Sequence, residues 1–303
     1  MLVSNENIDL TQYQEYSYIR NQVNEKSEFT DELVEYFEAR KNGILGDKLP
    51  WGCASQLIGF RKKEITVLAG VNGHGKSLVL GQIALDFVEK GAKVLMASLE
   101  MPPVTSLARM TRQATGLAFP DKSMINRFME WKLDQFYLYN HVGSLEPWQV
   151  IALCRYASKE LGISHVIVDS LTKCTRGEQD YDGQKDFMNQ LCEVAKEANI
   201  HIFLVHHVRK GNDETSESNK FDLKGSGSIS DLADNVIIIA RNKKKEKETY
   251  NNGGVADNTV PDATLLVVKQ RHGDFEGIIP LWFDKKSQQF TESPHGLPTR
   301  YMD

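Results

Sequence analysis

Apolar residues in this chain of 303 residues occur in short unbroken runs, and several of the segments between these runs have helical spacing. An unbroken apolar run of strand length is typical of a strand that is covered on both faces of a sheet. After the first run, residues 77–88 place apolar side chains at the i, i+3, i+4 spacing of a helix with one buried face. The pattern predicts an α/β fold with a doubly wound, mainly parallel sheet flanked by helices. The runs that we expect to form strands are residues 65–69, 93–98, 165–168, 201–205, 235–240 and 263–268.

The first 45 residues are polar and charged, apart from one amphipathic stretch at residues 29–40. Its apolar side chains fall on one side of a helix: Leu33, Val34, Tyr36 and Phe37. So small an element cannot form a core of its own, and we expect it to pack on the main domain or on a neighbouring subunit. We therefore expect residues 1–49 to be a short helical N-terminal extension, with a linker helix for subunit packing, and residues 50–303 to be the main domain.

Three polar segments are expected to be loops, because they are rich in Gly, Asn, Ser and charged residues: residues 174–184, 209–228 and 242–262. Loops of this length inside a compact domain are usually functional or disordered. The third segment includes a lysine-rich run at residues 243–247. Such a charge run is usually a solvated turn, and contact with DNA is the alternative.

Composition narrows the class of protein. Hydrophobic residues make up 41% of the chain and charged residues 25%, so a globular protein with a sizeable core is expected. The four cysteines show no C-x-x-C pairing, which argues against a zinc site or a disulfide framework and favours a reduced, cytoplasmic setting. No apolar run approaches the roughly 18 residues that span a bilayer, so no membrane partner is expected. The net charge of -5 gives no global attraction to nucleic acid, and any contact with DNA has to be local.

Residues 70–77, GVNGHGKS, match the phosphate-binding pattern G-x-x-x-x-G-K-[ST] in full, between a predicted strand and a predicted helix. The N–H groups of the loop and of the helix N-terminus would converge on a nucleoside triphosphate, with Lys76 on the terminal phosphates and Ser77 on a magnesium ion. The expected nucleotide-binding residues of the loop are Gly70, Asn72, Gly73, His74, Gly75, Lys76, Ser77 and Leu78. A chance match in an ordinary turn is the alternative, and the flanking elements argue against it.

Polar side chains end three of the predicted strands, where a doubly wound sheet places its ligand site. Asp169 is expected to bind the metal, and the alternative is a helix cap. Glu100 can orient or deprotonate a water molecule, and the alternative is a carboxylate favoured by a helix dipole. Only one of His206 and His207 should point at the site, because strand residues alternate sides; a hydrogen-bonded surface pair is the alternative.

The order of these motifs resembles the ATPase domain of RecA-like ring helicases, the family of bacterial DnaB, mitochondrial Twinkle and the phage primase-helicases. The resemblance covers about residues 52–290, and besides GVNGHGKS its marks are SLEMP at 98–102, VIVDS at 166–170, LVHH at 204–207, DLKGSGSISDLADNVIIIARN at 222–242 and VVKQRHGDFEG at 267–277. It implies a RecA-like fold, ATP, dTTP or another nucleoside triphosphate with Mg²⁺ as cofactors, and a bacterial or phage-infected cell as the setting. No zinc ribbon or primase domain is visible, so priming belongs to a separate protein, with a separate polymerase, or to another part of a longer chain.

The resemblance also implies roles for single residues. Glu100 corresponds to the catalytic base, Asp169 to the carboxylate on the metal, and His207 to the sensor of the γ-phosphate, where DnaB has glutamine. Lys269 and Arg271 correspond to the basic pair that the family delivers to the nucleotide of the next subunit. An arginine there stabilises charge on the transferred phosphoryl oxygens, and a solvated pair on an edge strand is the alternative.

Two further residues, Arg241 and Phe283, correspond to the arginine and the aromatic residue that contact the base, with a core position as the alternative for Phe283. The resemblance places the loops at 174–184 and 209–228 on the inner wall of a hexameric ring that faces single-stranded DNA. Glycines there allow backbone N–H groups to approach a phosphate closely. The expected DNA-binding residues are Lys210, Lys220, Lys224, Gly225, Ser226 and Gly227.

Together these features predict a homohexameric, magnesium-dependent DNA helicase that moves on single-stranded DNA, 5′ to 3′, at a forked duplex. The helix at residues 29–40 resembles in position the linker helix by which such helicases attach to the adjacent subunit. Two alternatives stay open: a RecA- or RadA-type recombination ATPase that exchanges strands, and a nucleotide-binding ring that loads or scaffolds other proteins without unwinding.

Overall fold

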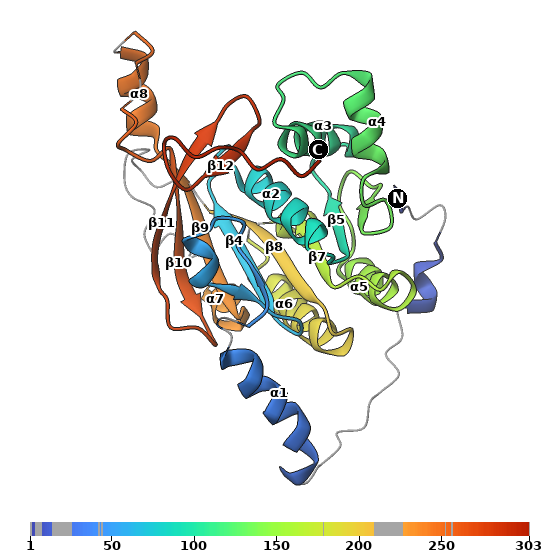
Figure 1. Cartoon of the computed structure of the whole chain (residues 1–303). Coiled ribbons are helices and arrows are strands. Elements are labelled where there is room, and N and C mark those ends of the chain that lie inside the picture. The colour runs from blue at the N-terminus through green and yellow to red at the C-terminus, as the bar shows by residue number, and fades with distance from the viewer. Residues whose placement is uncertain are drawn as a thin grey trace.

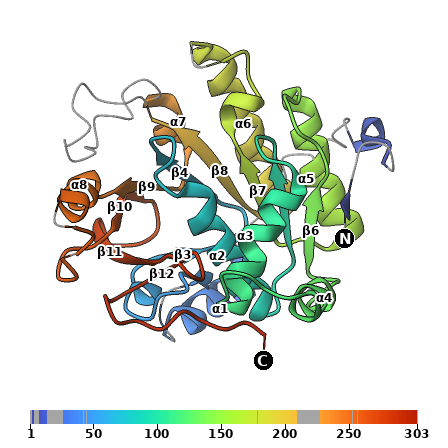
Figure 2. The same cartoon turned by 90° about the horizontal axis from the view of Figure 1, so that it is seen from above.

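The computed structural model describes residues 2–3, 8–13, 26–41, 43, 45–177, 179–208, 227–251, 253–255 and 257–302. A ten-stranded sheet runs through the molecule in the order β1-β6-β5-β7-β8-β4-β9-β10-β11-β12, with helices on both faces (Figure 1, Figure 2). From β1 to β9 in this order neighbouring strands are parallel, and from β9 to β12 they are antiparallel. The predicted doubly wound, mainly parallel sheet is confirmed.

The apolar runs predicted six strands, and all six are confirmed. They are β4 (Ile65–Gly70), β5 (Val94–Ser98), β7 (His165–Asp169), β8 (His201–His207), β9 (Asn235–Arg241) and β10 (Ala263–Gln270). The first three of these are buried throughout, which agrees with strands covered on both faces. Four further strands of this ten-stranded sheet were not predicted: β1 (Leu2–Val3), β6 (Phe136–Tyr139), β11 (Gly277–Asp284) and β12 (Gln289–Thr291).

Two groups of helices cover the two faces of the sheet (Figure 2). One face packs against α2 (Lys76–Glu89), α3 (Pro103–Thr115) and α4 (Lys122–Glu130). The other face packs against α5 (Pro147–Leu161), α6 (Tyr181–Glu197) and the short α7 (Gly227–Leu232). Because α2 directly follows β4, the phosphate-binding loop lies at the carboxyl edge of the parallel strands.

Short elements complete the chain. β2 (Asp47–Lys48) pairs with β3 (Gly59–Phe60), and four 3-10 turns are η1 (Leu10–Tyr13), η2 (Lys26–Phe29), η3 (Ala54–Gln56) and η4 (Leu171–Lys173). The helix predicted at residues 29–40 is present as α1 (Thr30–Lys41), which projects from the body of the molecule (Figure 1). Its apolar side chains are exposed in the single chain, Leu33 by 55% and Phe37 by 56%.

Two of the predicted loops are partly helical, so these predictions were wrong in part. In the segment 174–184, α6 already begins at Tyr181, because the Asp180 side chain accepts a hydrogen bond from the N–H of Gly183 at 3.1 Å and caps the helix. In the segment 242–262, residues Lys243–Asn251 form helix α8.

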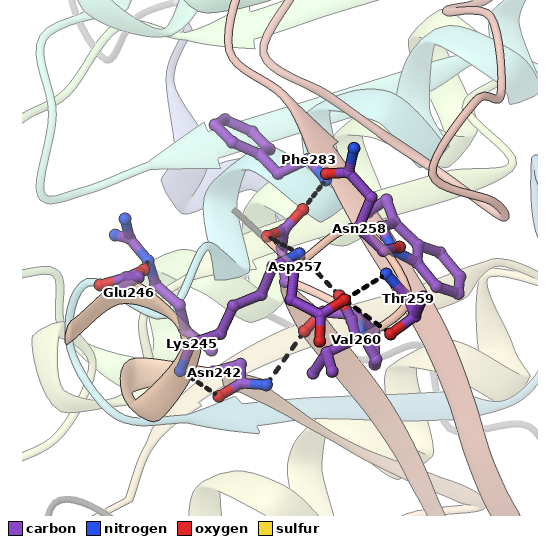
Figure 3. A network of polar contacts seen from close by, with 12 residues as sticks. Asn242, Lys245, Glu246, Asp257, Asn258, Thr259, Val260 and Phe283 are labelled. Atoms are coloured by element: carbon purple, nitrogen blue, oxygen red, sulfur yellow. Dashed lines mark hydrogen bonds and ion pairs between the residues drawn. The ribbon is translucent and has the colours of Figure 1, made fainter. Parts of the chain in front are cut away.

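Helix α8 includes the lysine-rich run, which was expected to be a solvated turn. The Asn242 side chain accepts a hydrogen bond from the N–H of Lys245 at 2.9 Å and so caps the helix. Lys245 is buried, because its Nζ pairs with Asp262 at 2.7 Å and donates to the carbonyl oxygen of Val260 at 2.6 Å (Figure 3). A buried lysine paired with a partly exposed carboxylate thus fixes a charged segment that has no apolar stripe.

No helix in the described ranges combines the length and the hydrophobicity that crossing a bilayer requires. Residues 209–226, which make up most of the second predicted loop, lie outside the described residues.

Candidate active site

The phosphate-binding loop joins β4 to α2, and its glycines give it a shape that other residues would strain. Gly73 and Gly75 have φ angles of 81° and 97°, in the left-handed region that favours glycine. A Cβ atom at Gly70 would lie 2.6 Å from the carbonyl oxygen of Ile239 on β9. No side chain in the described ranges caps the N-terminus of α2, so the N–H groups of its first turn are available to an anion.

Lys76 is buried beneath this loop. Its Nζ donates hydrogen bonds to the carbonyl oxygens of Gly70 at 2.8 Å and of Val71 at 3.2 Å. Burial lowers the pKa of Lys76, while the carboxylates of Asp169 and Glu100 act in the opposite direction. A buried ammonium group that has no ion pair among the described residues favours an anionic ligand such as a polyphosphate.

Ser77 and Asp169 meet at the same edge of the sheet. The Ser77 hydroxyl donates a hydrogen bond to Oδ2 of Asp169 at 2.7 Å. Burial raises the pKa of Asp169; the hydrogen bond from Ser77 opposes this rise, and the carboxylate of Glu100 adds to it. A buried carboxylate beside a second carboxylate is a position where a cation is electrostatically favoured.

These two oxygen ligands fit a magnesium site. Mg²⁺ prefers oxygen ligands and is commonly bound through one or two carboxylates together with substrate phosphates and water. Within the described residues, no three His, Cys, Asp or Glu side chains converge on a metal position. A magnesium ion at Ser77 and Asp169 would therefore take its remaining ligands from the nucleotide and from water.

Glu100 lies just beyond the end of β5, beside Ser170 and His207. Its Oε1 accepts hydrogen bonds from the Ser170 hydroxyl at 2.7 Å and from His207 Nε2 at 2.9 Å. Burial acts against the charge on Glu100, but these hydrogen bonds, with His207 and Lys173 nearby, outweigh it, so the pKa of Glu100 is lowered. The side chain is 35% exposed, so an ionised carboxylate faces solvent.

The two histidines at the end of β8 point to opposite sides. His207 contacts Glu100, whereas His206 is buried. Burial, with the neighbouring His207 and Lys76, lowers the pKa of His206 to about 4. Only His207 is placed to act in the site.

Glu100 and His207 line an open pocket of about 500 Å³, a size typical of small-molecule sites. Its other lining residues are Asn72 of the phosphate-binding loop, Leu99, Val142, Gly143, Thr172, Lys173 and Gly177. The loop, the exposed carboxylate and the histidine therefore share one opening.

Arg241 and Phe283 lie on the other side of the phosphate-binding loop. The backbone N–H of Arg241 donates to Nδ1 of His74 at 3.3 Å, and its guanidinium pairs with Glu246 of α8. The Phe283 ring lies 5.0 Å from the ring of Phe290, between centroids, and is half-buried. Arg241 thus contacts the loop directly, whereas Phe283 is linked to it through Phe290, whose ring lies beside Gly75.

Lys269 and Arg271 lie at the opposite edge of the sheet from Lys76. Strand β10 ends at Gln270, which pairs with Asn235, the first residue of β9. Asn235 also pairs with Thr66, the second residue of β4. The phosphate-binding loop follows the far end of β4, about five strand residues or roughly 16 Å away. Neither cation reaches the loop of its own chain.

Five of the expected DNA-binding residues lie outside the described residues: Lys210, Lys220, Lys224, Gly225 and Ser226. Gly227 is the first residue of α7 and is exposed.

Comparison with known protein families shows to which family the chain belongs. The sequence profile of the family described as "DnaB-like helicase C terminal domain" matches residues 54–292. The chain belongs to this family.

The "DNA helicase/primase" of Enterobacteria phage T3 is 24% identical to this DnaB-like chain over 214 residues, which are 64% of the chain and 38% of the phage protein. The "Replicative DNA helicase DnaC" of Bacillus subtilis is 21% identical over 281 residues, which are 86% of the chain and 60% of that protein. The chain thus spans less than two thirds of the length of these relatives.

Solved structures share the fold of the DnaB-like chain. One structure, described as an ATPase domain, has a TM-score of 0.74 at 15% identity and covers 89% of this chain and 99% of its own. A structure titled "The Structure Of A DnaB-Like Replicative Helicase And Its Interactions With Primase" has a TM-score of 0.69 at 15% identity and covers 89% of this chain and 67% of its own. The predicted RecA-like fold is confirmed.

Sequence reasoning gave no role to Ser170, Thr172, Lys173 or Asp234 of this DnaB-like chain. Ser170 follows Asp169 at the end of β7, so its position beyond a strand at the ligand edge was a usable signal. The Asp234 contacts involve residues distant in sequence, and no local pattern indicates them.

Proposed function

We propose that this DnaB-like chain is the motor of an ATP-dependent replicative DNA helicase that moves along single-stranded DNA as a homohexameric ring. The observation that carries the proposal is the gathering of Lys76, Asp169 and Glu100 at one edge of the sheet. They supply an anion site, a cation site and an ionised carboxylate beside an open pocket, which nucleoside triphosphate hydrolysis requires. Membership of the DnaB-like family supports DNA as the substrate.

In this proposal Glu100 orients the attacking water and accepts its proton. The lowered pKa keeps the carboxylate ionised, and the hydrogen bonds from Ser170 and His207 fix its position. Lys76 turns from the carbonyl oxygens of the loop to the terminal phosphates. A magnesium ion held at Ser77 and Asp169 would neutralise charge on the β- and γ-phosphates.

Lys269 and Arg271 are proposed to act on the nucleotide of a neighbouring subunit, since they lie far from the loop of their own chain. Cations that a neighbour supplies make hydrolysis depend on subunit contact. The exposed apolar side of α1 is the proposed contact with the adjacent subunit, because burial of each large apolar side chain stabilises an interface by about 1.5–3 kcal/mol. Leu33 and Phe37 are its most exposed members.

The DNA contacts are proposed in the segments 174–184 and 209–228, with Lys210, Lys220 and Lys224 on phosphates. These segments follow β7 and β8, so both leave the sheet at the edge where the nucleotide site lies. Hydrolysis could then move them along the strand, 5′ to 3′, toward a forked duplex. A primase and a polymerase are proposed as separate partners.

Unwinding of a forked duplex tests the proposal. Lys76→Ala should abolish both ATP hydrolysis and unwinding, because the buried ammonium group of the loop is lost. Lys62→Ala, at an exposed lysine, is the matched control and should keep both activities. Native mass spectrometry of the wild type with ATP should show a six-subunit particle. Equal unwinding by wild type and Lys76→Ala would reject the mechanism.

Phosphate release with and without single-stranded DNA separates the helicase from the alternatives. A helicase should hydrolyse ATP faster when DNA is present, whereas a loading or scaffolding ring should not respond. Strand exchange without unwinding would instead indicate a recombination ATPase.

A further inference from the structure

Asp234, at the junction of α7 and β9, holds Arg271. The two side chains form an ion pair, with Oδ1 of Asp234 at 2.8 Å from Nη1 of Arg271. The backbone N–H of Arg271 also donates to the carbonyl oxygen of Asp234 at 2.8 Å. Both ends of the arginine are therefore fixed to one residue, while 43% of its side-chain surface stays exposed.

Asp234 is itself fixed to the centre of the sheet. Its Oδ2 accepts a hydrogen bond from the N–H of Ile65 at 2.9 Å, and its own N–H donates to the carbonyl oxygen of Ile65 at 3.0 Å. Ile65 is the first residue of β4 and is fully buried. A buried carboxylate held on a central strand is a rigid partner for a flexible guanidinium.

Lys269 contacts the same junction. Its Nζ donates to the carbonyl oxygens of Ser230 at 2.9 Å and Asp231 at 2.8 Å. Nη2 of Arg271 lies 3.5 Å from the carbonyl oxygen of the next residue, Leu232. These are the last carbonyl groups of α7, and cations are favoured at a helix C-terminus. The C-terminus of α7 and Asp234 thus carry both cations that we assign to the neighbouring nucleotide.

We propose that Asp234 is a positioning residue that aims Arg271 at the nucleotide of the adjacent subunit. One terminal nitrogen of Arg271 binds Asp234 and the other lies near the carbonyl oxygen of Leu232, which leaves the remaining N–H donors of the guanidinium for the phosphoryl oxygens. The inference rests on the proposed function, since it requires Arg271 to act on a neighbour. It also ties the arginine to the segment assigned to DNA, because α7 continues directly from that segment.

Asp234→Asn is the first test, because the amide keeps the shape of the side chain and an acceptor for Ile65 but removes the charge. We expect kcat for ATP to fall about tenfold to a hundredfold, since a misdirected catalytic group costs that much. KM and nucleotide affinity should not change, because the nucleotide site of the same chain is remote. Glu197→Gln is the control, since it breaks another ion pair between two elements, with Arg155 at 3.1 Å, between α5 and α6, and kcat should stay at the wild-type value.

Mixed rings separate a positioning role from a merely structural one. In a ring of Asp234→Asn and Lys76→Ala subunits, some interfaces combine the intact nucleotide site of the first variant with the intact arginine and Asp234 of the second. In a random one-to-one mixture about a quarter of the interfaces are of this kind. Mixing two nearly inactive proteins should therefore restore ATP hydrolysis.

A mixture of Arg271→Ala with Lys76→Ala tests the proposed function by itself. Recovery in both mixtures supports the inference. Recovery with Arg271→Ala but not with Asp234→Asn overturns the role of Asp234 and leaves the proposed function intact. Failure of both mixtures overturns the delivery of Arg271 to a neighbour, and the inference with it. An unchanged kcat in Asp234→Asn overturns the inference alone.

Discussion

Neighbouring side chains set the pKa of Glu100 and so decide whether its carboxyl group is ionised and can act as a base. Burial alone would raise the pKa, but the hydrogen bonds from Ser170 and His207 lower it below the ordinary value of 4.5. The group is therefore ionised at every pH above that value. The hydroxyl of Ser170, which is fully buried, is as much a part of this arrangement as the histidine.

Glu100→Gln should lower kcat for ATP hydrolysis by about 10²–10⁴-fold, because the amide cannot accept a proton from water. Nucleotide affinity should be unchanged, since the phosphate-binding loop and Asp169 are intact. Rapid-quench kinetics and equilibrium binding measure the two quantities. Glu89→Gln, at an exposed carboxylate near the end of α2, is the control. A Glu100→Gln protein that hydrolyses ATP within threefold of the wild type would show that another group activates the water.

Helix α8 illustrates an element that is held by one buried cation. Asp262 links it to the sheet, since one carboxylate oxygen pairs with Lys245 and the other accepts the backbone N–H of Phe283 at 2.8 Å (Figure 3). The resemblance to ring helicases predicts that Phe283 contacts the nucleotide base, and in that case the anchor of α8 also supports one wall of the site.

Lys245→Met should loosen α8 and speed proteolysis within residues 243–262. The carboxylate of Asp262 and the carbonyl oxygen of Val260 lose their donor, at a cost of about 1–3 kcal/mol. Limited proteolysis and hydrogen exchange of this segment measure the effect. Lys244→Met is the control, because the Lys244 side chain is 77% exposed and its ion pair with Glu248 is long, at 3.9 Å. Such an exposed pair contributes little to stability. Equal protection in both variants would mean that α8 does not depend on Lys245.

The sequence predicted the elements whose stability depends on burial, and it missed those that depend on partners. The unbroken apolar runs identified β4 to β10 with the exception of β6, a strand of only four residues. Strand β11 was not predicted, because its residues alternate between buried and exposed and it contains Pro280. Proline is typical of strands away from the centre of a sheet. Helix α8 was not predicted, because the Asn242 cap and the Lys245–Asp262 ion pair stabilise it rather than an apolar stripe.

The same distinction holds for the site. The residues of the loop and the strand-end carboxylates follow local motifs, so Lys76, Asp169 and Glu100 could be identified from spacing. The contacts of Asp234 join the starts of β4 and β9 to the end of β10, and only the sheet order brings these segments together. The roles of all these residues stay predictions until the variants are measured.

Acid stability is a property of the whole molecule, and two buried histidines should set it. Burial, with His165 as a minor contribution, lowers the pKa of His201 to about 3, and that of His206 is lowered to about 4. Both folded values lie below the ordinary value of 6.5, so the unfolded chain binds protons first as the pH falls. Their neutral forms stabilise the fold fully above pH 6.5, and stability declines below it, by on the order of 2 kcal/mol for each histidine at pH 5.

Urea unfolding at pH 7.5 and pH 5.0 measures this decline. His201→Gln should reduce the difference between the two midpoints, because the amide keeps a donor for the Arg61 carbonyl oxygen and an acceptor for Thr66 but does not titrate. His295→Gln, at an exposed histidine, should leave the difference as in the wild type. Identical pH dependence in all three proteins would contradict the assignment.

The placement of Arg271 and Lys76 at opposite ends of β4 gives the subunit two unlike sides. In the proposed ring each copy therefore faces the back of the next, so that every copy both receives an arginine and supplies one. If Arg271 acts as proposed, damage to it silences the site of the neighbour and spares that of its own chain.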